Sequence, residues 1–386
     1  MEYIATTFQG LEEILAKELT ALGVEVTQIY TRAVGFIADK AMLYKANLHL
    51  RTAIRILQPI SRFDVNSDQQ LYQAAYDINW TDYFDLSQTF AVQSAIHSPY
   101  FNHSQYVALK VKDAIVDKFR NKLGSRPNVR LDNPDVRIHI HISGTTGSLL
   151  LDSSGESLHK RGYRVATTEA PLNEVLAAGL VLISGWKGET NLIDPMCGSG
   201  TIAIEAAMVA ANIAPNINRQ SFGFQRWKDY DAELWEQTKQ AAIAQQRDME
   251  HWIYAHDVLP SAIEATKQNI EKAGVDEFVK LGVKDFEHTP APAGAGLVIV
   301  NPPYDLRLPI DDANAFYRMI GDTLKKNYNG YKAWILSGNK DAIKNVGLKA
   351  ARRHTLYNGP VDCKFYQYEL YSGKKKVEEE VPITEK

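Results

Sequence analysis

The sequence predicts an α/β protein in which a seven-stranded, mostly parallel Rossmann-like sheet follows two smaller α+β units. The first observation is a short apolar strand at residues 191–193 that continues through Asp194 and two glycines into a helical stretch at 202–208. The second is a set of three later strand patterns, each ending at a polar residue. The third is the alternation of period-2 and period-3.6 apolar patterns in the first 165 residues, which separates strands from helices.

The first predicted unit, residues 1–60, is a small ferredoxin-like α+β unit. Apolar residues recur at helical spacing between residues 11 and 22, which predicts a helix there. The other elements predicted in this unit are strands at 2–6, 25–30 and 33–38 and a second helix at 41–48.

The second predicted unit, residues 61–165, combines helices at 67–75 and 104–122 with strands at 89–96 and 136–142. In the last strand, valine and isoleucines alternate with Arg137, His139 and His141. One face of this strand is therefore predicted to be buried and the other polar. Two histidines at this spacing could bind a metal, but no partner cluster accompanies them, so we expect a surface face and no metal site.

The third predicted unit, residues 166–386, carries the large sheet. Its later elements are a helix at 260–272 and strands at 251–257, 279–283, 298–300, 331–336 and 364–370. The charged tail after Tyr371 is predicted to be disordered.

The most informative segment is the glycine loop at residues 194–201, Asp-Pro-Met-Cys-Gly-Ser-Gly-Thr. A phosphate-binding P-loop requires a lysine after its last glycine, and none follows Gly200. The dinucleotide fingerprint requires a third glycine, but Ile202 and Ala203 follow instead. A carboxylate that ends a strand can pair with a cationic ammonium, such as that of S-adenosylmethionine. We therefore expect S-adenosylmethionine to be bound by Asp194, Pro195, Cys197, Gly198, Ser199, Gly200 and Thr201.

Two further strand ends supply the other half of the expected cofactor site. Asp257 ends the second strand of the large sheet, where a carboxylate accepts hydrogen bonds from ribose hydroxyls in related folds. Asp285 ends the third strand and is followed by Phe286. This pair suits an adenine amino group held beside an aromatic face.

The fourth strand ends at Asn301-Pro302-Pro303-Tyr304. An exocyclic amine is a poor nucleophile because its lone pair is delocalised into the ring. The Asn301 side-chain carbonyl and a neighbouring proline carbonyl can accept its two N–H groups, while Tyr304 offers a stacking face. The motif predicts methylation of a planar amine: N2 of guanine, N6 of adenine or the side-chain amide of glutamine.

Composition and charge agree with an intracellular enzyme. A content of 45% hydrophobic and 23% charged residues is ordinary for a soluble protein. No apolar run suits a bilayer and no basic leader precedes one, so we expect a cytoplasmic protein without membrane contact. The two cysteines predict neither a disulfide framework nor a metal cluster, and Cys363 is assigned no role.

The net charge of −3 does not favour nucleic-acid binding, but its distribution does. Eight basic and four acidic residues lie between residues 105 and 137, a local excess of +4. Such an excess suits contacts with phosphates.

The glycine loop, the Asn-Pro-Pro-Tyr motif and the junction at 158–164 resemble those of class I S-adenosylmethionine-dependent RNA methyltransferases with an N-terminal THUMP domain. Segments 170–174 and 222–227 also resemble that family, whose bacterial members include 23S ribosomal RNA guanine-N2 methyltransferases. The resemblance implies a class I methyltransferase domain preceded by a ferredoxin-like unit and a THUMP domain. It further implies a structured RNA partner, with Lys110, Lys112, Arg126 and Arg307 as candidate contacts.

The expected reaction is direct in-line methyl transfer to guanine N2 of 23S ribosomal RNA by a monomer or homodimer. Three alternatives remain open: adenine N6, guanine N2 of transfer RNA, and a non-catalytic RNA-binding assembly factor. The sequence departs from many relatives at one place, because Asp257 stands there as a single acid where they have two.

Overall fold

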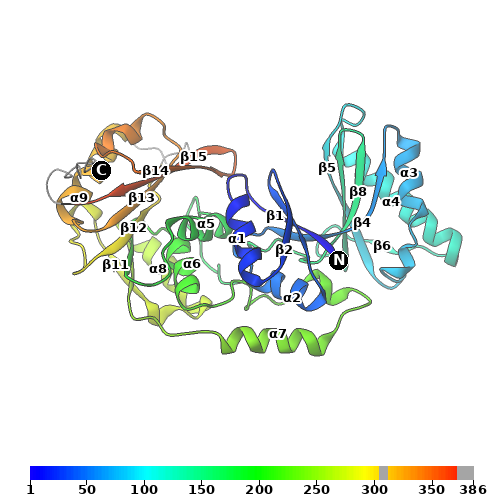
Figure 1. Cartoon of the computed structure of the whole chain (residues 1–386), viewed down its shortest axis with the longest axis horizontal. Coiled ribbons are helices and arrows are strands. Elements are labelled where there is room, and N and C mark those ends of the chain that lie inside the picture. Colours follow the sequence, from blue (N-terminus) through cyan, green and yellow to red (C-terminus); the bar gives the residue numbers. More distant parts are fainter. Residues whose placement is uncertain (304–311, 372–386) are drawn as a thin grey trace, which may run out of the picture. The chain divides into compact units, whose positions relative to one another are not determined.

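The structure, a computed structural model, describes residues 1–303 and 312–371. The chain forms two compact units. The N-terminal unit comprises residues 1–165, 172–183 and 208–248, and the C-terminal unit comprises residues 166–171, 184–207 and 249–386. Each unit contains its own β-sheet (Figure 1). The predicted combination of a ferredoxin-like unit, a THUMP-type unit and a seven-stranded α/β sheet is confirmed.

The sheet of the N-terminal unit has eight strands in the order β2-β3-β1-β4-β8-β7-β5-β6. Their bounds are β1 (Glu2–Thr6), β2 (Glu25–Tyr30), β3 (Ala33–Ile37), β4 (Arg55–Asp64), β5 (Thr89–His97), β6 (Asn128–Val129), β7 (Val136–Ser143) and β8 (Thr146–Asp152). The long strand β4 pairs with β1 near its start and with β8 over most of its length. It therefore joins the two predicted small units into one continuous sheet, and residue 60 lies inside it.

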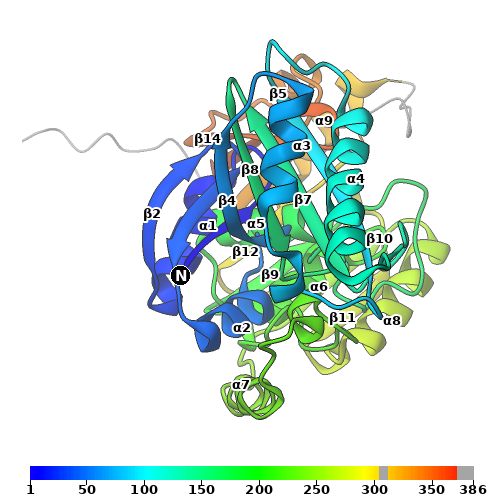
Figure 2. The same ribbon diagram turned by 90° about the vertical axis from the view of Figure 1, so that its right-hand side faces the viewer.

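Helices pack on this sheet in two groups, each over its own hydrophobic core. Their bounds are α1 (Glu12–Leu22), α2 (Lys40–His49), α3 (Asp68–Asp77) and α4 (Ser104–Leu123), and a short 3-10 turn, η1 (Trp80–Asp82), follows α3. Helices α3 and α4 lie on the same side of β5, β7 and β8 in both views (Figures 1 and 2). Residues Ile138, Ile140 and Ile142 of β7 point into the core beneath these helices, whereas Arg137, His139 and His141 alternate with them as predicted.

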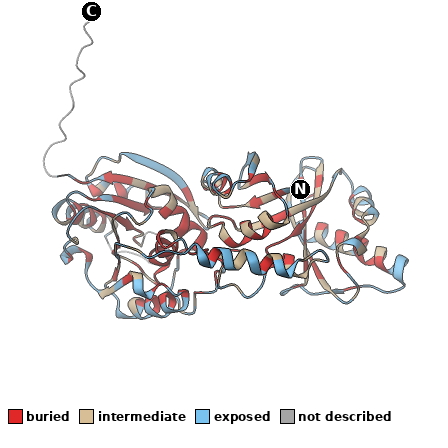
Figure 3. Ribbon diagram, turned by 60° about the horizontal axis from the view of Figure 1, so that its bottom comes forward, coloured by how far each residue is buried: buried red, intermediate tan, exposed pale blue. Residues whose placement is uncertain are grey.

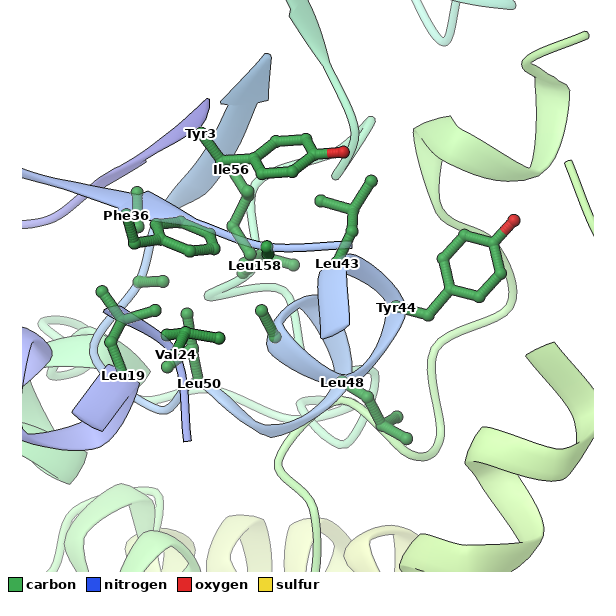
Figure 4. Packing of buried hydrophobic residues seen from close by; sticks show 14 of the residues in the cluster. Tyr3, Leu19, Val24, Phe36, Leu43, Tyr44, Leu48, Leu50, Ile56 and Leu158 are labelled. Carbon is green, nitrogen blue, oxygen red and sulfur yellow. The ribbon is translucent and has the colours of Figure 1, made fainter. Parts of the chain in front are cut away.

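A second core fills the ferredoxin-like half, where Tyr3, Phe36 and Leu43 surround Ile56 (Figure 4). Segment 208–248, which the sequence assigns to the third unit, completes this core. Its helix α7 (Ala232–Ala244) buries Trp235, and the preceding turn η2 (Gly223–Arg226) buries Phe224. The Phe224 ring stacks on Tyr44 with ring centroids 4.3 Å apart. Sequence segments far apart along the chain therefore build one hydrophobic core.

The sheet of the C-terminal unit has seven strands in the order β11-β10-β9-β12-β13-β15-β14. Their bounds are β9 (Asn191–Asp194), β10 (Ile253–Asp257), β11 (Val279–Val283), β12 (Gly296–Val300), β13 (Lys332–Ser337), β14 (Arg352–Asn358) and β15 (Val361–Glu369). Strands β9 to β13 are parallel, and β15 is antiparallel to both of its neighbours. The predicted seven-stranded, mostly parallel sheet is confirmed.

The remaining described elements are α5 (Glu174–Ser184), α6 (Thr201–Ala210), α8 (Pro260–Ala273), α9 (Ala313–Asn327), η3 (Asp276–Phe278), η4 (Phe286–His288) and η5 (Ala342–Val346). Buried and exposed residues alternate along the helices (Figure 3). Within residues 1–303 and 312–371, no helix has both the length and the apolar character that crossing a membrane requires. The tail predicted to be disordered lies outside the described residues.

Candidate active site

The glycine loop connects β9 to α6, as the sequence predicts. Gly198 and Gly200 adopt φ angles of +56° and +82°, a region that disfavours side chains. A Cβ atom on Gly200 would lie 2.6 Å from Cγ2 of Thr266. Both the backbone conformation and the close packing therefore require glycine at position 200.

Two buried polar residues of α8 hold this loop in place. The Thr266 hydroxyl donates to the carbonyl oxygen of Gly198 (2.9 Å). The Asn269 side-chain amide donates to the carbonyl oxygens of Ser199 and Ala166 (both 2.9 Å), and its Oδ1 accepts from the Ala166 N–H (3.0 Å). The sequence analysis does not identify either residue, because their roles depend on contacts between α8 and distant segments.

Cys197 serves the loop by packing. Its backbone N–H donates to the carbonyl oxygen of His256 (2.9 Å), which ties the loop to β10. Burial raises the pKa of the Cys197 thiol well above its usual range. The thiol therefore stays protonated, which excludes it as a nucleophile.

Asp194 ends β9 with a fully buried side chain. Neither of its carboxylate oxygens has a hydrogen-bond partner of normal geometry among the described residues. Burial, reinforced by the Asp257 carboxylate, raises the pKa of Asp194 to about 8. An unpaired buried carboxyl is unfavourable unless it is neutral or meets a cation. The site therefore suits the ammonium of S-adenosylmethionine.

Asp257 ends β10, the strand next to β9. Its Oδ2 accepts from the Gly198 N–H and its Oδ1 from the Leu259 N–H, both at 3.0 Å. Each oxygen keeps capacity for a second donor, as a ribose hydroxyl would supply. The apolar side chains of Val258 and Leu259 directly after it are 63% and 57% exposed, a feature that sequence alone does not show.

Asp285 and Phe286 lie in and beside η4, after β11. The exposed Asp285 side chain accepts from the Glu287 N–H at 3.0 Å. The Phe286 ring is buried and packs on Tyr328, with ring centroids 5.5 Å apart. The aromatic face expected beside adenine therefore belongs to the core, because Phe286 fills the space between η4 and the end of α9.

Asn301 follows the fully buried strand β12, which lies between β9 and β13. Its Oδ1 atom is buried and has no hydrogen-bond partner in the part of the chain that the structure describes. Pro302 is buried and Pro303 is partly exposed. Tyr304 and Arg307 lie outside the described residues.

The sheet order brings the predicted residues together. Strands β10, β9 and β12 are adjacent and parallel, so Asp257, Asp194 and Asn301 all lie at the carboxyl edge of the sheet, where ligands bind in such folds. A carboxylate suited to a cation and a side-chain carbonyl that has no partner among the described residues thus lie at one edge. This arrangement is suited to methyl transfer from S-adenosylmethionine to an amino nitrogen.

The three RNA-contact candidates that can be located lie in the N-terminal unit. Lys112 forms an ion pair with Asp113 (2.5 Å), and the Lys110 ammonium lies 5.5 Å from the centre of the Tyr72 ring. Arg126 is exposed in the loop after α4. The predicted polar face of β7 is partly engaged, because His139 hydrogen-bonds to the buried Asp152 (3.1 Å).

Three family models match the chain in succession. Residues 2–57 match the RlmL ferredoxin-like domain, residues 65–152 match the THUMP domain, and residues 161–367 match the RMKL-like methyltransferase domain.

Known proteins resemble the whole chain. It is 40% identical to a putative RNA methyltransferase of Synechocystis over 96% of this chain and 97% of that protein. It is 39% identical to the ribosomal RNA large subunit methyltransferase K/L of Photobacterium profundum over 98% of this chain, but it spans only 54% of that longer protein. A putative methyltransferase crystallised with S-adenosylhomocysteine is 31% identical, with a TM-score of 0.87 and coverage of 97% of this chain and 99% of that one.

Proposed function

Because the chain belongs to the RMKL-like methyltransferase family and carries a THUMP domain, we propose that it methylates N2 of a guanine in 23S ribosomal RNA. At the coarser level it is an S-adenosylmethionine-dependent RNA methyltransferase. The observation that carries the methyl transfer to an amine is the buried Oδ1 of Asn301, which has no partner within the described residues and lies at the same sheet edge as Asp194. The choice of ribosomal RNA is proposed from the similarity to the ribosomal RNA large subunit methyltransferase K/L, and the choice of guanine N2 from the family resemblance of the sequence.

We assign the cofactor to the carboxyl ends of β9 and β10. Asp194 would pair with the methionine ammonium, Asp257 would accept from the ribose hydroxyls, and the exposed side chains of Val258 and Leu259 would lie against the adenine. The sulfonium supplies an already activated methyl group, so the residues need to provide orientation and hydrogen-bond acceptors only.

Asn301 acts on the methyl acceptor. Its Oδ1 accepts one N–H of the exocyclic amine, which draws the lone pair out of the ring and toward the methyl group. The nitrogen gains the methyl group and then releases one proton to water. Tyr304 is proposed to stack on the base.

The THUMP domain is proposed to hold the RNA by its phosphates. Of the predicted contacts, Arg126 has no ion-pair partner within the described ranges, whereas Lys110 and Lys112 already contact Tyr72 and Asp113. We therefore assign Arg126 the larger share of phosphate binding. A ribosomal RNA substrate would place the enzyme in the cytoplasm.

Mass spectrometry of nucleosides from ribosomal and transfer RNA tests the proposal in a deletion strain and its parent. We expect the loss of one N2-methylguanosine from 23S ribosomal RNA. Loss of N2-methylguanosine from transfer RNA would identify transfer RNA as the substrate instead. Loss of an N6-methyladenosine would identify adenine N6 as the methyl acceptor. If both strains carry the same modifications, an assembly role without catalysis gains support.

A further inference from the structure

Segment 338–345 follows β13 and is tied to α9 at its far end. Strands β12 and β13 pair in parallel, with Val300 opposite Ile335, so both strands end at the sheet edge where Asn301 lies. At the other end, the Asn345 amide donates to Oδ1 of Asn314 in the first turn of α9 (2.9 Å). Segment 338–345 therefore starts at the sheet edge that carries Asn301.

A buried polar pair fixes the start of this segment. The hydroxyls of Tyr317 and Ser337 are 2.7 Å apart, and both residues are buried within the core between α9 and the sheet. The Ser337 hydroxyl oxygen also accepts from the Asn339 N–H (3.1 Å). Asn339 consequently follows β13 in a conformation held by α9.

Among the described residues, only the oxygen of the Asn339 side-chain amide forms hydrogen bonds. Its Oδ1 accepts from the N–H groups of Ala342 (2.9 Å) and Asp341 (3.2 Å), which caps the short turn η5. Its Nδ2 has no hydrogen-bond partner among residues 1–303 and 312–371, and the residue is partly exposed. The cap holds the amide in one orientation, so two N–H donors remain available at this sheet edge.

We propose that Asn339 is a specificity-determining residue that donates from Nδ2 to an acceptor atom of the target base. The inference rests on the methyl transfer proposed above. Asn301 would accept from the exocyclic amine, and Asn339 would donate to the acceptor nitrogen next to it in the ring, which is N3 in guanine. Two fixed amides would thus read one edge of the base, and a base that does not match would leave the buried Asn301 oxygen or the Asn339 donors without a partner in the complex.

Two substitutions separate this role from capping. Asn339→Asp keeps the oxygen that caps η5 but replaces the donors by an acceptor, and Asn339→Ser keeps a neutral capping oxygen on a shorter side chain. The measurement is the rate at which a tritiated methyl group passes from S-adenosylmethionine to unmodified transcripts of 23S ribosomal RNA and of transfer RNA. We expect kcat/KM for RNA to fall about 10- to 100-fold in both variants. The melting temperature and the affinity for S-adenosylhomocysteine should stay unchanged.

Asn327→Asp is the matched control because it makes the same change of charge at the last residue of α9. That residue lies at the other end of the helix from Asn314 and Tyr317, which contact residues 345 and 337. Wild-type rates in both Asn339 variants would show that the residue is only a cap and would overturn the inference. A loss in Asn339→Asp alone would point to charge repulsion and overturn it as well, as would a parallel loss of S-adenosylhomocysteine binding. If the wild-type protein methylates neither transcript, the proposed function itself fails.

Discussion

At the scale of single residues, the candidate site is marked by polar atoms that the fold buries without satisfying. Within residues 1–303 and 312–371, both carboxylate oxygens of Asp194 and the side-chain oxygen of Asn301 lack a hydrogen-bond partner of normal geometry. Folding gains nothing from such atoms, since each costs about 1–3 kcal/mol when it loses water without a partner. Their concentration at one sheet edge therefore indicates that ligands, rather than protein groups, complete these bonds.

The raised pKa of Asp194 makes cofactor binding depend on pH. The carboxyl is largely protonated at neutral pH in the free protein, because its pKa is about 8, whereas pairing with an ammonium requires the ionised form. The affinity for S-adenosylhomocysteine should therefore rise about tenfold per pH unit below 8 and level off above it. Isothermal titration calorimetry between pH 6 and 8.5 measures this. Asp194→Asn should bind weakly and lose the pH dependence; an unchanged slope would contradict the assignment.

Asn301→Ala should separate binding from turnover. The side chain touches the methyl acceptor in the proposed mechanism, so its removal should lower kcat about 100- to 1,000-fold. The affinity for S-adenosylhomocysteine should remain close to that of the wild type. Single-turnover methylation together with calorimetry checks both quantities. Wild-type turnover would remove Asn301 from the mechanism.

At the scale of elements, α8 acts as the support of the glycine loop. Asn269 is fully buried and makes three hydrogen bonds to the backbone of residues 166 and 199. Asn269→Ala should lower the free energy of unfolding by about 1–3 kcal/mol and weaken S-adenosylhomocysteine binding, although the residue is not proposed to touch the cofactor. Denaturant unfolding and calorimetry test this. Asn327→Ala, on α9, serves as the control and should leave cofactor affinity unchanged.

The elements that the sequence predicts are those with a strong local pattern. The turn from β9 to α6 combines an acid, two glycines and an apolar helix within a few residues, so both the element and its role are predictable. Strand β14 begins with Arg352, Arg353 and His354, all exposed at the sheet edge, and such an edge strand lacks an apolar alternation. Strand β4 contains Pro59 and a register shift, which interrupt its period-2 pattern. Helices α5, α7 and α9 and strand β8 are likewise absent from the predictions.

The residues of the site divide in the same way. Asp194, Asp257 and Asn301 each end a strand, and the known topology of parallel sheets brings strand ends together. The contributions of Thr266 and Asn269 arise from pairings across long stretches of chain. The burial of Phe286 against Tyr328 also arises from such a contact, and no local pattern distinguishes a buried aromatic ring from an exposed one.

At the scale of the whole molecule, the N-terminal unit depends on residues from the later part of the chain. Phe224 and Trp235 pack into the core around Tyr44. Arg219 donates to the backbone carbonyls of Ser157 and Lys160 (both 2.9 Å), within the segment that leaves β8. Residues 1–165 therefore lack part of their own core.

A fragment of residues 1–165 should consequently fail to unfold cooperatively. Removal of segment 208–248 exposes the apolar surface that Phe224 and Trp235 cover, and the loss of one such aromatic contact alone costs about 3–5 kcal/mol. A fragment of residues 1–248 should recover a cooperative transition. Thermal unfolding followed by circular dichroism compares the two. Equal, cooperative melting of both fragments would show that segment 208–248 is dispensable to this core.

The shared strand β4 also limits how such enzymes can be rebuilt. Its residues belong to the ferredoxin-like half at one end and to the THUMP half at the other, so a cut between the halves divides the single eight-stranded sheet. Recombination or engineering that exchanges the RNA-binding part must therefore move both halves together, along with segment 208–248, which completes their core. The ferredoxin-like and THUMP family models thus match two halves of one sheet.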